Sequence, residues 1–340
     1  MMTRELATDL PVWAAPMAGG PSTVGLVIAA ARAGGLGFLA GGYKTPDALA
    51  AQLTEVRASG VAYGVNLFAP NPIAIKQLDY LAYARVLQPE ADRYGIALGD
   101  EPRNTDDDAW NAKLELLLEA RVPVVSFTFG LPDADAVRAL QTVGSVVAQT
   151  VTTPGEAVAA AELGADLLIV QAPAAGGHSA TFTPEQVQEA VGLPDLISTV
   201  RDVVALPIIA AGGIASSGDS AAAINAGART VMVGTALLRT HESGASEPHK
   251  AALIDPRFGE TALTKAFTGR PARGLRNYFI DRYEGSAPLG YPAIHHLTSP
   301  LRKAATAAND TTLIHLWAGT GYRAAQAEPA ATTLKRLAPS

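Results

Sequence analysis

The sequence predicts an α/β fold, a (βα)8 TIM barrel that carries a smaller covering subdomain formed by two insertions. Three observations support this fold: eight short apolar runs, Ala- and Leu-rich segments between them, and glycine at the carboxyl ends of the last two runs. Apolar runs this short are typical of parallel strands buried on both faces, and their alternation with helices favours a closed barrel. An open α/β sheet of six or seven strands is the alternative.

The expected elements alternate along most of the chain. The expected strands are residues 12–15, 36–39, 62–66, 124–127, 145–150, 167–171, 207–211 and 230–233. The expected helices include residues 22–33, 46–59, 134–140, 154–163 and 217–226. Thr-Pro pairs at 45–46, 153–154 and 183–184 are typical helix starts, because the hydroxyl can cap the helix and Pro suits its first position. Gly34, Gly164 and Gly227 are expected to end helices in the left-handed conformation.

Two segments interrupt this alternation, residues 70–118 and 243–309. Both follow the carboxyl ends of expected strands, the third and the eighth, so we expect both on the catalytic face of the barrel. There they would form a substrate-covering subdomain that excludes water. The barrel itself would then comprise residues 1–69, 119–242 and 310–340. Two unrelated surface insertions are the alternative.

Composition limits the chemistry and the partners. The 340 residues include no cysteine. This excludes disulfides, thiolate catalysis, iron–sulfur clusters and cysteine-ligated zinc, so redox chemistry would need an organic cofactor. The net charge is −6 and the basic residues are scattered, which argues against a nucleic-acid or membrane partner. No apolar stretch has membrane-spanning length, and residues 1–9 are polar, so we expect a cytoplasmic protein, for which a homodimer is compatible with the sequence.

The last two expected strands are followed by Gly212-Gly213 and Gly234-Thr235. Glycine at a strand's carboxyl end lets a ligand approach the bare backbone, and the loops after the last two strands of a (βα)8 barrel commonly hold a phosphate. The sequence therefore predicts a phosphorylated cofactor. An ordinary tight turn is the alternative for the Gly-Gly pair.

Three side chains are candidates for binding and chemistry at the same barrel face. Asn66 and Gln171 end the third and sixth expected strands, and their amides suit the donor–acceptor edge of a flavin or a nucleobase. His178 follows Gly176-Gly177 on a loop over the barrel mouth. The alternatives are strand capping or loop support for the two amides, and a loop residue without a chemical role for His178.

Five short motifs, in order, carry a resemblance to a known family. They are Pro-Met-Ala-Gly-Gly at 16–20, Gly-Phe-Leu-Ala-Gly-Gly-Tyr at 37–43, Gly-Val-Asn-Leu-Phe at 64–68, Val-Val-Ser-Phe-Thr-Phe-Gly at 124–130 and Ala-Gly-Gly-His at 175–178. Together with the Ala-Gly-Gly-Ile and Gly-Thr-Ala loops after the last two strands, they resemble the motifs of nitronate monooxygenases, formerly called 2-nitropropane dioxygenases. The resemblance extends from residue 11 to about residue 238.

The resemblance implies an FMN enzyme that oxidises anionic alkyl nitronates with O2 to a carbonyl compound and nitrite. It implies that His178 is the active-site histidine, which either hydrogen-bonds the nitro group or takes a proton from a neutral nitroalkane. A histidine near its reference pKa could do either at neutral pH. The residues expected to contact the cofactor are Pro16, Met17, Ala18, Asn66, Gln171, Gly176, Gly177, Gly212, Gly213, Met232, Val233, Gly234 and Thr235.

Two departures from the family pattern leave the substrate open. Ala174 stands where the family usually has Glu, and Ser179-Ala180 stands where Arg-Gly commonly follows the histidine. Both changes remove charge near the site. In the second insertion, Tyr291 and His295 fall four residues apart and are candidates for substrate contact, with a helix surface as the alternative. No histidine pairs convincingly with a carboxylate, so we expect no metal.

Three other functions remain open from the sequence. An NAD(P)H-dependent FMN reductase of quinones or enoyl thioesters would use the same barrel. A non-flavin lyase or isomerase would share the phosphate loops, but the expected strand ends carry Asn, Gln, Gly and Ser rather than Lys or a carboxylate pair. A scaffolding protein would leave the glycine-lined barrel mouth without a ligand to explain it.

Overall fold

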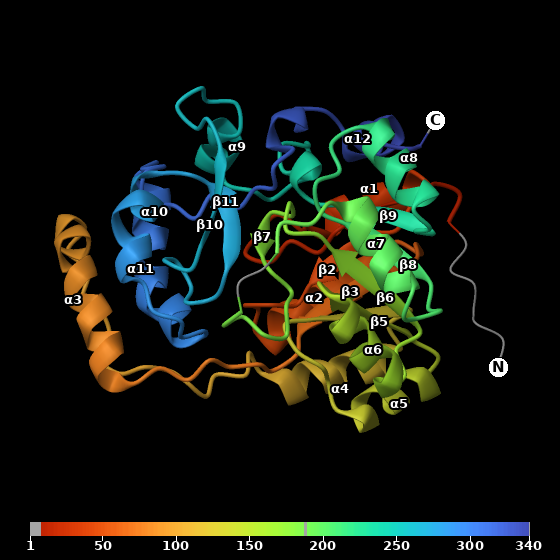
Figure 1. Cartoon of the computed structure of the whole chain (residues 1–340), viewed down its shortest axis with the longest axis horizontal. Coiled ribbons are helices and arrows are strands. Elements are labelled where there is room, and N and C mark those ends of the chain that lie inside the picture. The colour runs from red at the N-terminus through yellow and green to blue at the C-terminus, as the bar shows by residue number, and fades with distance from the viewer. Residues whose placement is uncertain (1–7, 187–188, 340) are drawn as a thin grey trace.

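The computed structural model describes residues 8–186 and 189–339; residues 1–7, most of the polar N-terminal start, lie outside them. Eight parallel strands form one sheet in the order β1-β9-β8-β6-β5-β4-β3-β2, and a bridge between Ala14 and Gly37 links its two edges. The sheet thus closes almost completely into the predicted barrel (Figure 1). Its strands are β1 (Val12–Ala14), β2 (Phe38–Ala40), β3 (Gly64–Phe68), β4 (Val124–Thr128), β5 (Val146–Val151), β6 (Leu167–Gln171), β8 (Ile208–Ala211) and β9 (Thr230–Val233).

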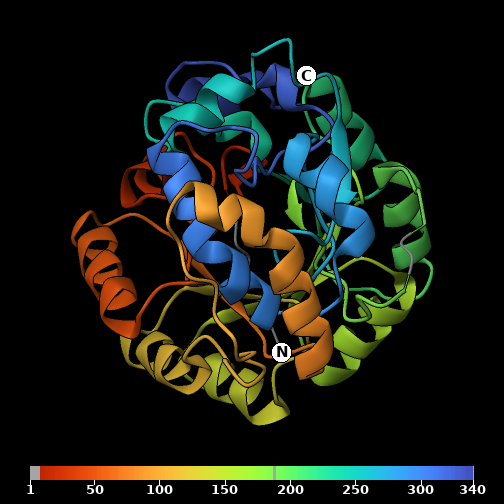
Figure 2. The ribbon, with the colours of Figure 1, turned by 90° about the vertical axis from the view of Figure 1, so that its left-hand side faces the viewer.

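Helices surround the barrel (Figure 2). They are α1 (Val24–Arg32), α2 (Pro46–Ala58), α4 (Trp110–Ala120), α5 (Ala134–Thr142), α6 (Pro154–Leu163), α7 (Leu193–Arg201) and α8 (Ser217–Asn225). The hydroxyls of Thr45 and Thr153 cap α2 and α6, as predicted. Gly34, Gly164 and Gly227 have φ of +94°, +95° and +111°, the left-handed conformation expected after a helix. A later helix, α12 (Ala330–Arg336), packs against α1 and β1.

One predicted helix start is wrong. The helix expected at Thr183-Pro184 begins instead at Leu193, and residues 184–186 form a turn. The chain before this turn is tied to Glu156, whose Oε1 accepts hydrogen bonds from Thr181 Oγ1 and from Phe182 N. These bonds fix the chain just before the expected helix start against α6. Pro194 supplies the proline of the actual helix start.

The barrel interior is filled by one cluster of buried side chains. Its members come from seven of the eight strands and include Trp13, Phe38, Ile169, Ile209 and Met232. The remaining strand, β3, contributes Gly64 at this level. A Cβ at Gly64 would lie 2.3 Å from Cε1 of Phe38, so the absence of a side chain makes room for the Phe38 ring. The interior is therefore a packed core, with ligand space left only at its mouth.

The two insertions lie side by side over the carboxyl ends of the strands (Figures 1 and 2). Their helices are α3 (Gln77–Arg93), α9 (Glu247–Ala252), α10 (Tyr278–Tyr283) and α11 (Ala293–Ala307). The second insertion also forms β10 (Thr261–Thr264) and β11 (Ala272–Leu275), which make a small antiparallel sheet with β7 (Gly177–His178) from the loop after β6, in the order β10-β11-β7. A short 3-10 helix, η2 (Glu284–Ser286), lies in the second insertion, whereas η1 (Thr235–Leu237) precedes it and η3 (Tyr322–Ala324) follows it. We call the two insertions together the cap; their assignment as a separate domain remains a prediction.

A buried apolar cluster distinct from the barrel core joins the two insertions. It includes Tyr83 and Leu87 from α3, Phe279 from α10 and Leu297 from α11. It also takes in Leu313, which follows α11. The cap thus has its own hydrophobic core, which keeps both insertions in one position above the barrel.

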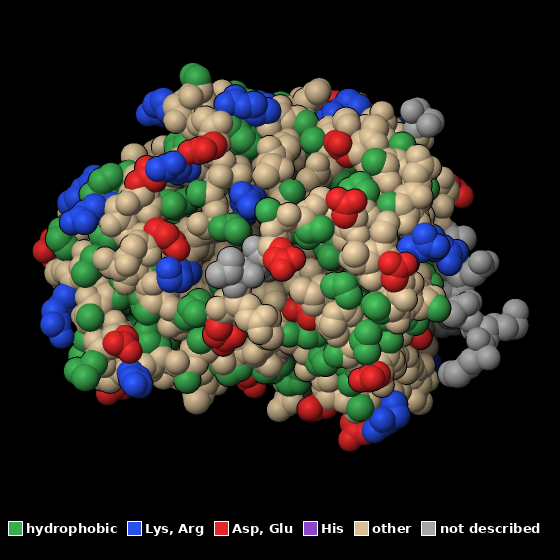
Figure 3. All heavy atoms as spheres, viewed as in Figure 1, with side chains coloured by type: hydrophobic (Ala, Val, Ile, Leu, Met, Phe, Trp, Pro, Cys, Tyr) green, Lys and Arg blue, Asp and Glu red, His purple; other side chains and the backbone are tan. Residues whose placement is uncertain are grey.

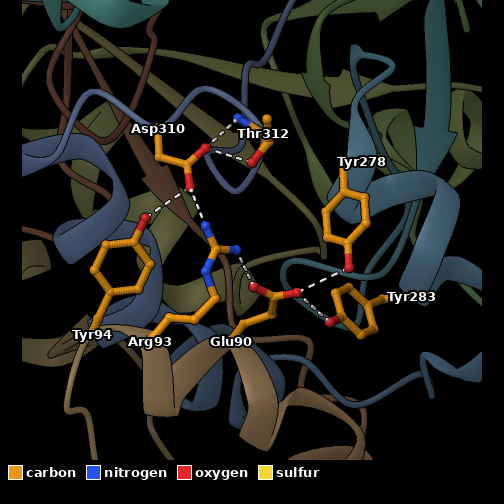
Figure 4. A network of polar contacts seen from close by, with 7 residues as sticks. All are labelled: Glu90, Arg93, Tyr94, Tyr278, Tyr283, Asp310 and Thr312. Atoms are coloured by element: carbon orange, nitrogen blue, oxygen red, sulfur yellow. Dashed lines mark hydrogen bonds and ion pairs between the residues drawn. The ribbon is translucent and has the colours of Figure 1, made fainter.

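A buried carboxylate fastens α3 to α10 (Figure 4). Glu90 is only 4% exposed, and its Oε1 accepts hydrogen bonds from the hydroxyls of Tyr278 (3.1 Å) and Tyr283 (2.9 Å). Its Oε2 accepts from Arg93 Nη1 at 2.6 Å, and Arg93 also reaches Asp310. Glu90 therefore connects the first insertion to the second through charge-assisted bonds.

None of the helices in the described ranges is long and apolar enough to cross a bilayer. On the face shown in Figure 3, basic and acidic side chains are interspersed and form no block of one sign.

We expect the Glu90→Gln variant to lower the free energy of unfolding by about 1–3 kcal/mol, because it removes the charge from a buried carboxylate that accepts three hydrogen bonds. Denaturant unfolding measures the loss. Asp79→Asn is the matched control, since Asp79 is an exposed carboxylate on the same helix. Equal small effects of both variants would contradict this role of Glu90.

Candidate functional site

One cavity of about 840 Å³ lies between the barrel mouth and the cap. All residues that the sequence predicted for the site line it: Pro16, Met17, Ala18, Asn66, Gln171, Gly176, Gly177, His178, Gly212, Gly213, Met232, Val233, Gly234, Thr235, Tyr291 and His295. The fold thus brings together side chains from barrel strands and from the second insertion. The volume is within the usual range for cofactor and substrate pockets.

The glycine loops after β8 and β9 expose backbone amides at the cavity. Gly212 and Gly213 have φ of +99° and +83°, a conformation that glycine adopts without strain. Within the described part of the chain, no protein acceptor takes the N–H of Gly213 or of Gly234. Unpaired backbone amides suit an anionic group such as phosphate, and the absence of a side chain at glycine lets such a group come close. Thr235 Oγ1 accepts a hydrogen bond from Gly319 N at 3.0 Å, so the loop at Gly319 lies beside these glycine loops, which we call the glycine cradle.

Asn66 is held in a fixed orientation by the neighbouring strand. Its side chain is 4% exposed, and Nδ2 lies 3.0 Å from Ser126 Oγ and 2.9 Å from Thr128 Oγ1. The register places Asn66 opposite Ser126, so β4 supplies these partners directly. Oδ1 has only a 3.4 Å contact with Thr128 Oγ1. The carbonyl end of the amide therefore remains able to accept a hydrogen bond from a ligand.

Gln171 supports the loop that carries the histidine. Its Oε1 accepts from Ala180 N at 2.8 Å, and its Nε2 donates to the His178 carbonyl at 3.3 Å. One Nε2 hydrogen remains for a ligand, because the amide carries two. Gln171 thus supports the backbone of this loop, which was one interpretation from the sequence, and it also lines the cavity. Ligand binding by its remaining hydrogen, the other interpretation, stays a prediction.

The segment around His178 is clamped between barrel and cap. Gly177 and His178 form β7, which pairs with Arg273 and Ala272 of β11. A Cβ at Gly176 would lie 2.5 Å from Gly319 N, so only glycine allows the two loops to approach this closely. The backbone of His178 is therefore fixed by a long-range strand pair that the sequence did not indicate.

The His178 imidazole is enclosed by aromatic rings. The centroids of Phe129, Tyr291 and Trp317 lie 5.4, 5.9 and 5.5 Å from the centroid of His178. Its Nε2 is 2.8 Å from Thr268 Oγ1, and Thr268 Oγ1 lies 3.2 Å from the Arg270 carbonyl. Thr268 thus fixes the rotation of the ring, which leaves Nδ1 as the nitrogen without a protein partner in the described structure.

Burial keeps the His178 imidazole neutral. Desolvation, followed by repulsion from the guanidinium groups of Arg270 and Arg302, lowers the pKa of His178 to about 3. The sequence led us to consider a histidine near its reference pKa, and the structure corrects this. At neutral pH the ring is an uncharged hydrogen-bonding group and a weak base.

Tyr291 and His295 reach the cavity, although they do not share a helical face. Tyr291 precedes α11, whereas His295 lies in its first turn. The His295 ring stacks on Tyr43 with 4.2 Å between centroids and 3° between planes. The Tyr43 hydroxyl is 3.5 Å from that of Tyr291. The two predicted substrate contacts therefore belong to one aromatic wall with Tyr43.

Several cavity residues were not predicted from the sequence. They are Tyr43, Thr268, Arg302, His315, Trp317, Gly319 and Gly321. Four of them follow α11, in the segment 310–340 that the sequence assigned to the barrel. These residues lie mostly in loops, where no periodicity or spacing marks a contact. Within the described ranges, no group of three or more His, Asp or Glu side chains could hold a metal ion.

Comparisons with known proteins agree with this architecture. The family model described as nitronate monooxygenase matches residues 1–339. A probable nitronate monooxygenase of Staphylococcus aureus (strain Newman) is 35% identical and covers 99% of this chain and 95% of its own length. A probable nitronate monooxygenase of Bacillus subtilis (strain 168) is also 35% identical, with 94% and 92% covered.

Two solved structures extend the comparison. A nitroalkane oxidase from Streptomyces ansochromogenes has a TM-score of 0.92 at 45% identity, covering 97% of this chain and 95% of its own. FabK from Thermotoga maritima, at 24% identity, shares the fold with a TM-score of 0.74, covering 97% and 92%. On the family match and on the identity with the bacterial relatives, this chain belongs to the nitronate monooxygenase family of flavin-dependent oxidoreductases.

Proposed function

We propose that this chain binds FMN at the barrel mouth and oxidises alkyl nitronates with O2 to a carbonyl compound and nitrite. The observation that carries the proposal is the convergence of three features on one cavity: unpaired glycine amides, two oriented carboxamides and a neutral histidine enclosed by aromatic rings. The membership of the chain in a flavin-dependent family supports the cofactor class. It also argues against the non-flavin lyase or isomerase considered from the sequence.

The residues present fit FMN. Gly213, Gly234 and Thr235 would hold the phosphate with backbone amides, and Asn66 and Gln171 would bind the polar edge of the ring through the acceptor and donor that the protein leaves free. When bound, FMN supplies the acceptance of electrons from the nitronate and their return to O2. The chain itself supplies binding, orientation and exclusion of water.

His178 would act as a hydrogen-bonding group for the substrate. An imidazole whose pKa is about 3 is a poor base for a neutral nitroalkane, since proton abstraction is most efficient when the pKa is near the working pH. A nitronate has already lost its proton and needs only positioning. We therefore assign to His178 a hydrogen bond to the nitro group of the substrate, with Thr268 fixing the orientation of the imidazole. Nitronates are then the preferred substrate class.

The reaction is tested by the absorbance of the FMN-loaded protein. Anaerobic addition of a small alkyl nitronate should bleach the flavin spectrum, and O2 should restore it with release of nitrite. Absence of anaerobic reduction by any short nitronate would contradict the proposal. NADH and NADPH in the same cuvette test the reductase alternative, which predicts bleaching by the nucleotide instead.

Gly234→Ala should weaken FMN binding and leave the fold intact. A Cβ at Gly234 would have Met17 Sδ as its nearest neighbour, at 3.5 Å, and the residue has φ of −115°, so alanine causes neither a clash nor left-handed strain. The methyl group would stand in the proposed phosphate cradle. We expect Kd for FMN to rise at least about tenfold in a fluorescence titration, a loss of about 1.4 kcal/mol.

The control for this variant is Gly259→Ala, because Gly259 lies away from the cavity and a Cβ there has no neighbour within 4 Å. Thermal unfolding of the protein without FMN should be alike for both variants. Equal FMN affinities of the Gly234→Ala and Gly259→Ala variants would contradict the proposed position of the phosphate at Gly234.

His178→Asn should lower kcat/KM for a nitronate by about 10²–10⁴-fold without loss of FMN, if the imidazole contacts the reacting group. Because the pKa of His178 is lowered to about 3, protonation would begin only far below neutral pH. The wild-type pH–rate profile for preformed nitronate should therefore show no histidine ionisation between about pH 6 and 9. An inflection near pH 6.5 that disappears in the Asn variant would contradict a neutral His178.

A further inference from the structure

Phe129 has a strained backbone and packs against two rings of the site. It directly follows β4 and has φ of +83°, in the left-handed region that favours glycine and that a bulky side chain rarely adopts. Its ring lines the cavity, stacks on Phe68 with 4.4 Å between centroids and lies edge-to-face with His178 at 5.4 Å. A strained residue of this kind persists only where its surroundings hold it in place.

The carbonyl of Phe129 is held from two sides. It accepts a hydrogen bond from Asn71 Nδ2 at 2.6 Å and another from Arg270 Nη2 at 3.2 Å. The Arg270 guanidinium also lies over the Phe129 ring, with 4.2 Å between its Cζ and the ring centroid. Arg270 thus contacts both the backbone and the ring of the strained residue, and burial strengthens the attraction between cation and ring.

Arg270 is a buried cation that joins three barrel loops to the cap. Its side chain is fully buried, and the residue lies two positions before β11. Besides the Phe129 carbonyl after β4, the guanidinium donates to the Thr181 carbonyl after β6, and its Nη1 lies 3.5 Å from the Asn71 carbonyl after β3. Because desolvation offsets much of the stability that a buried charge adds, we look for the contribution of Arg270 in the geometry that it fixes.

The charge of Arg270 also acts on His178. After desolvation, it is the largest cause that lowers the pKa of His178, and the charge of Arg302 follows. Burial lowers the pKa of Arg270 only to about 10, so the guanidinium stays protonated at neutral pH. Other titratable rings near His178 have pKa values shifted so that they are uncharged at neutral pH: Tyr291, His295 and His315.

We propose that Arg270 is a positioning residue for the reaction, which holds Phe129 in its left-handed conformation and thereby keeps the Phe129 ring against His178. For its effect on turnover the inference rests on the proposed function, whereas its effect on His178 is measured without substrate. Without the guanidinium fork, Phe129 would relax to negative φ, its ring would leave His178, and water would reach the imidazole. His178 would then lose both its fixed surroundings and its neutral state.

Arg270→Lys tests this role, because lysine keeps the positive charge and lacks the planar fork that reaches several carbonyls at once. We expect kcat/KM for a nitronate to fall at least about tenfold, while Kd for FMN changes less than about threefold. In nitrogen-15 NMR without substrate, His178 of the variant should titrate with a midpoint above about pH 5, whereas the wild-type ring stays neutral from about pH 5 to 9. An action of the charge alone predicts an unchanged His178.

Arg282→Lys is the matched control. Arg282 lies over the Tyr283 ring on the exposed surface of the cap, away from the cavity, so its substitution should leave kcat/KM and His178 as in the wild type. A folded Arg270→Lys protein with wild-type kcat/KM and a neutral His178 would overturn the proposal. A fall in kcat/KM with His178 still neutral would also overturn it, because Arg270 would then act elsewhere.

A second variant keeps the test independent of the folding of Arg270→Lys. Phe129→Leu removes the ring and leaves the carbonyl to which Arg270 donates. It should give the same titrating His178 and a similar loss of kcat/KM. The double variant should lose less than about threefold beyond the larger single effect, because both substitutions break one chain of contacts. Losses that multiply would overturn the proposal, and so would a Phe129→Leu protein with wild-type kcat/KM and a neutral His178.

Failure of this inference differs from failure of the proposed function. If the proposed function is wrong, a nitronate does not reduce the flavin of the wild type, yet the NMR comparison still tests whether Arg270 and Phe129 keep His178 neutral. If Arg270 is only structural, the wild-type reduction stands and His178 stays neutral in both single variants.

Discussion

The pairing of β7 with β11 is the interaction on which the site depends. Through it, the loop that leaves the barrel after β6 becomes a strand of the cap's sheet, so barrel and cap both position His178. Gln171 holds this loop from the barrel side, and Arg273 of β11 donates from Nε to the Pro173 carbonyl at 2.8 Å from the cap side. A shift of the cap would therefore move the histidine relative to the glycine loops after β8 and β9, so the packing of the cap core helps to fix the position of the histidine.

Closure by the cap also sets the electrostatics of the cavity. Enclosure by aromatic rings desolvates His178, and the nearby charges of Arg270 and Arg302 repel a proton on it, so both effects disfavour its protonated form. The same burial leaves Arg302 charged, because a guanidinium loses its proton only at much higher pH. The wall of the cavity thus carries a neutral histidine and a protonated Arg302 at neutral pH.

Much of this architecture could be predicted from the sequence, because it depends on local patterns. Short apolar runs predict the barrel strands, glycines mark the loops that line the cavity after the last two barrel strands, and the Gly-Gly-His sequence after a strand places a histidine at the mouth. What could not be predicted depends on distant residues. β7 and β11 are almost a hundred residues apart, and neither Arg302 nor Trp317 lies in a motif. The helix start at Thr183-Pro184 failed for the same reason, because tertiary bonds to Glu156 override the local signal. The pKa of His178 depends on burial, which no spacing reveals.

The central claim is that the cap holds His178 among aromatic rings above the barrel mouth and keeps its imidazole neutral. Nitrogen-15 NMR of the histidine side chains, with His178 assigned by its Asn variant, tests this claim most directly. The account predicts imidazole shifts of a neutral ring that do not change between about pH 5 and 9. A His178 resonance that titrates near pH 6.5 would show a hydrated, ionisable ring and would contradict it.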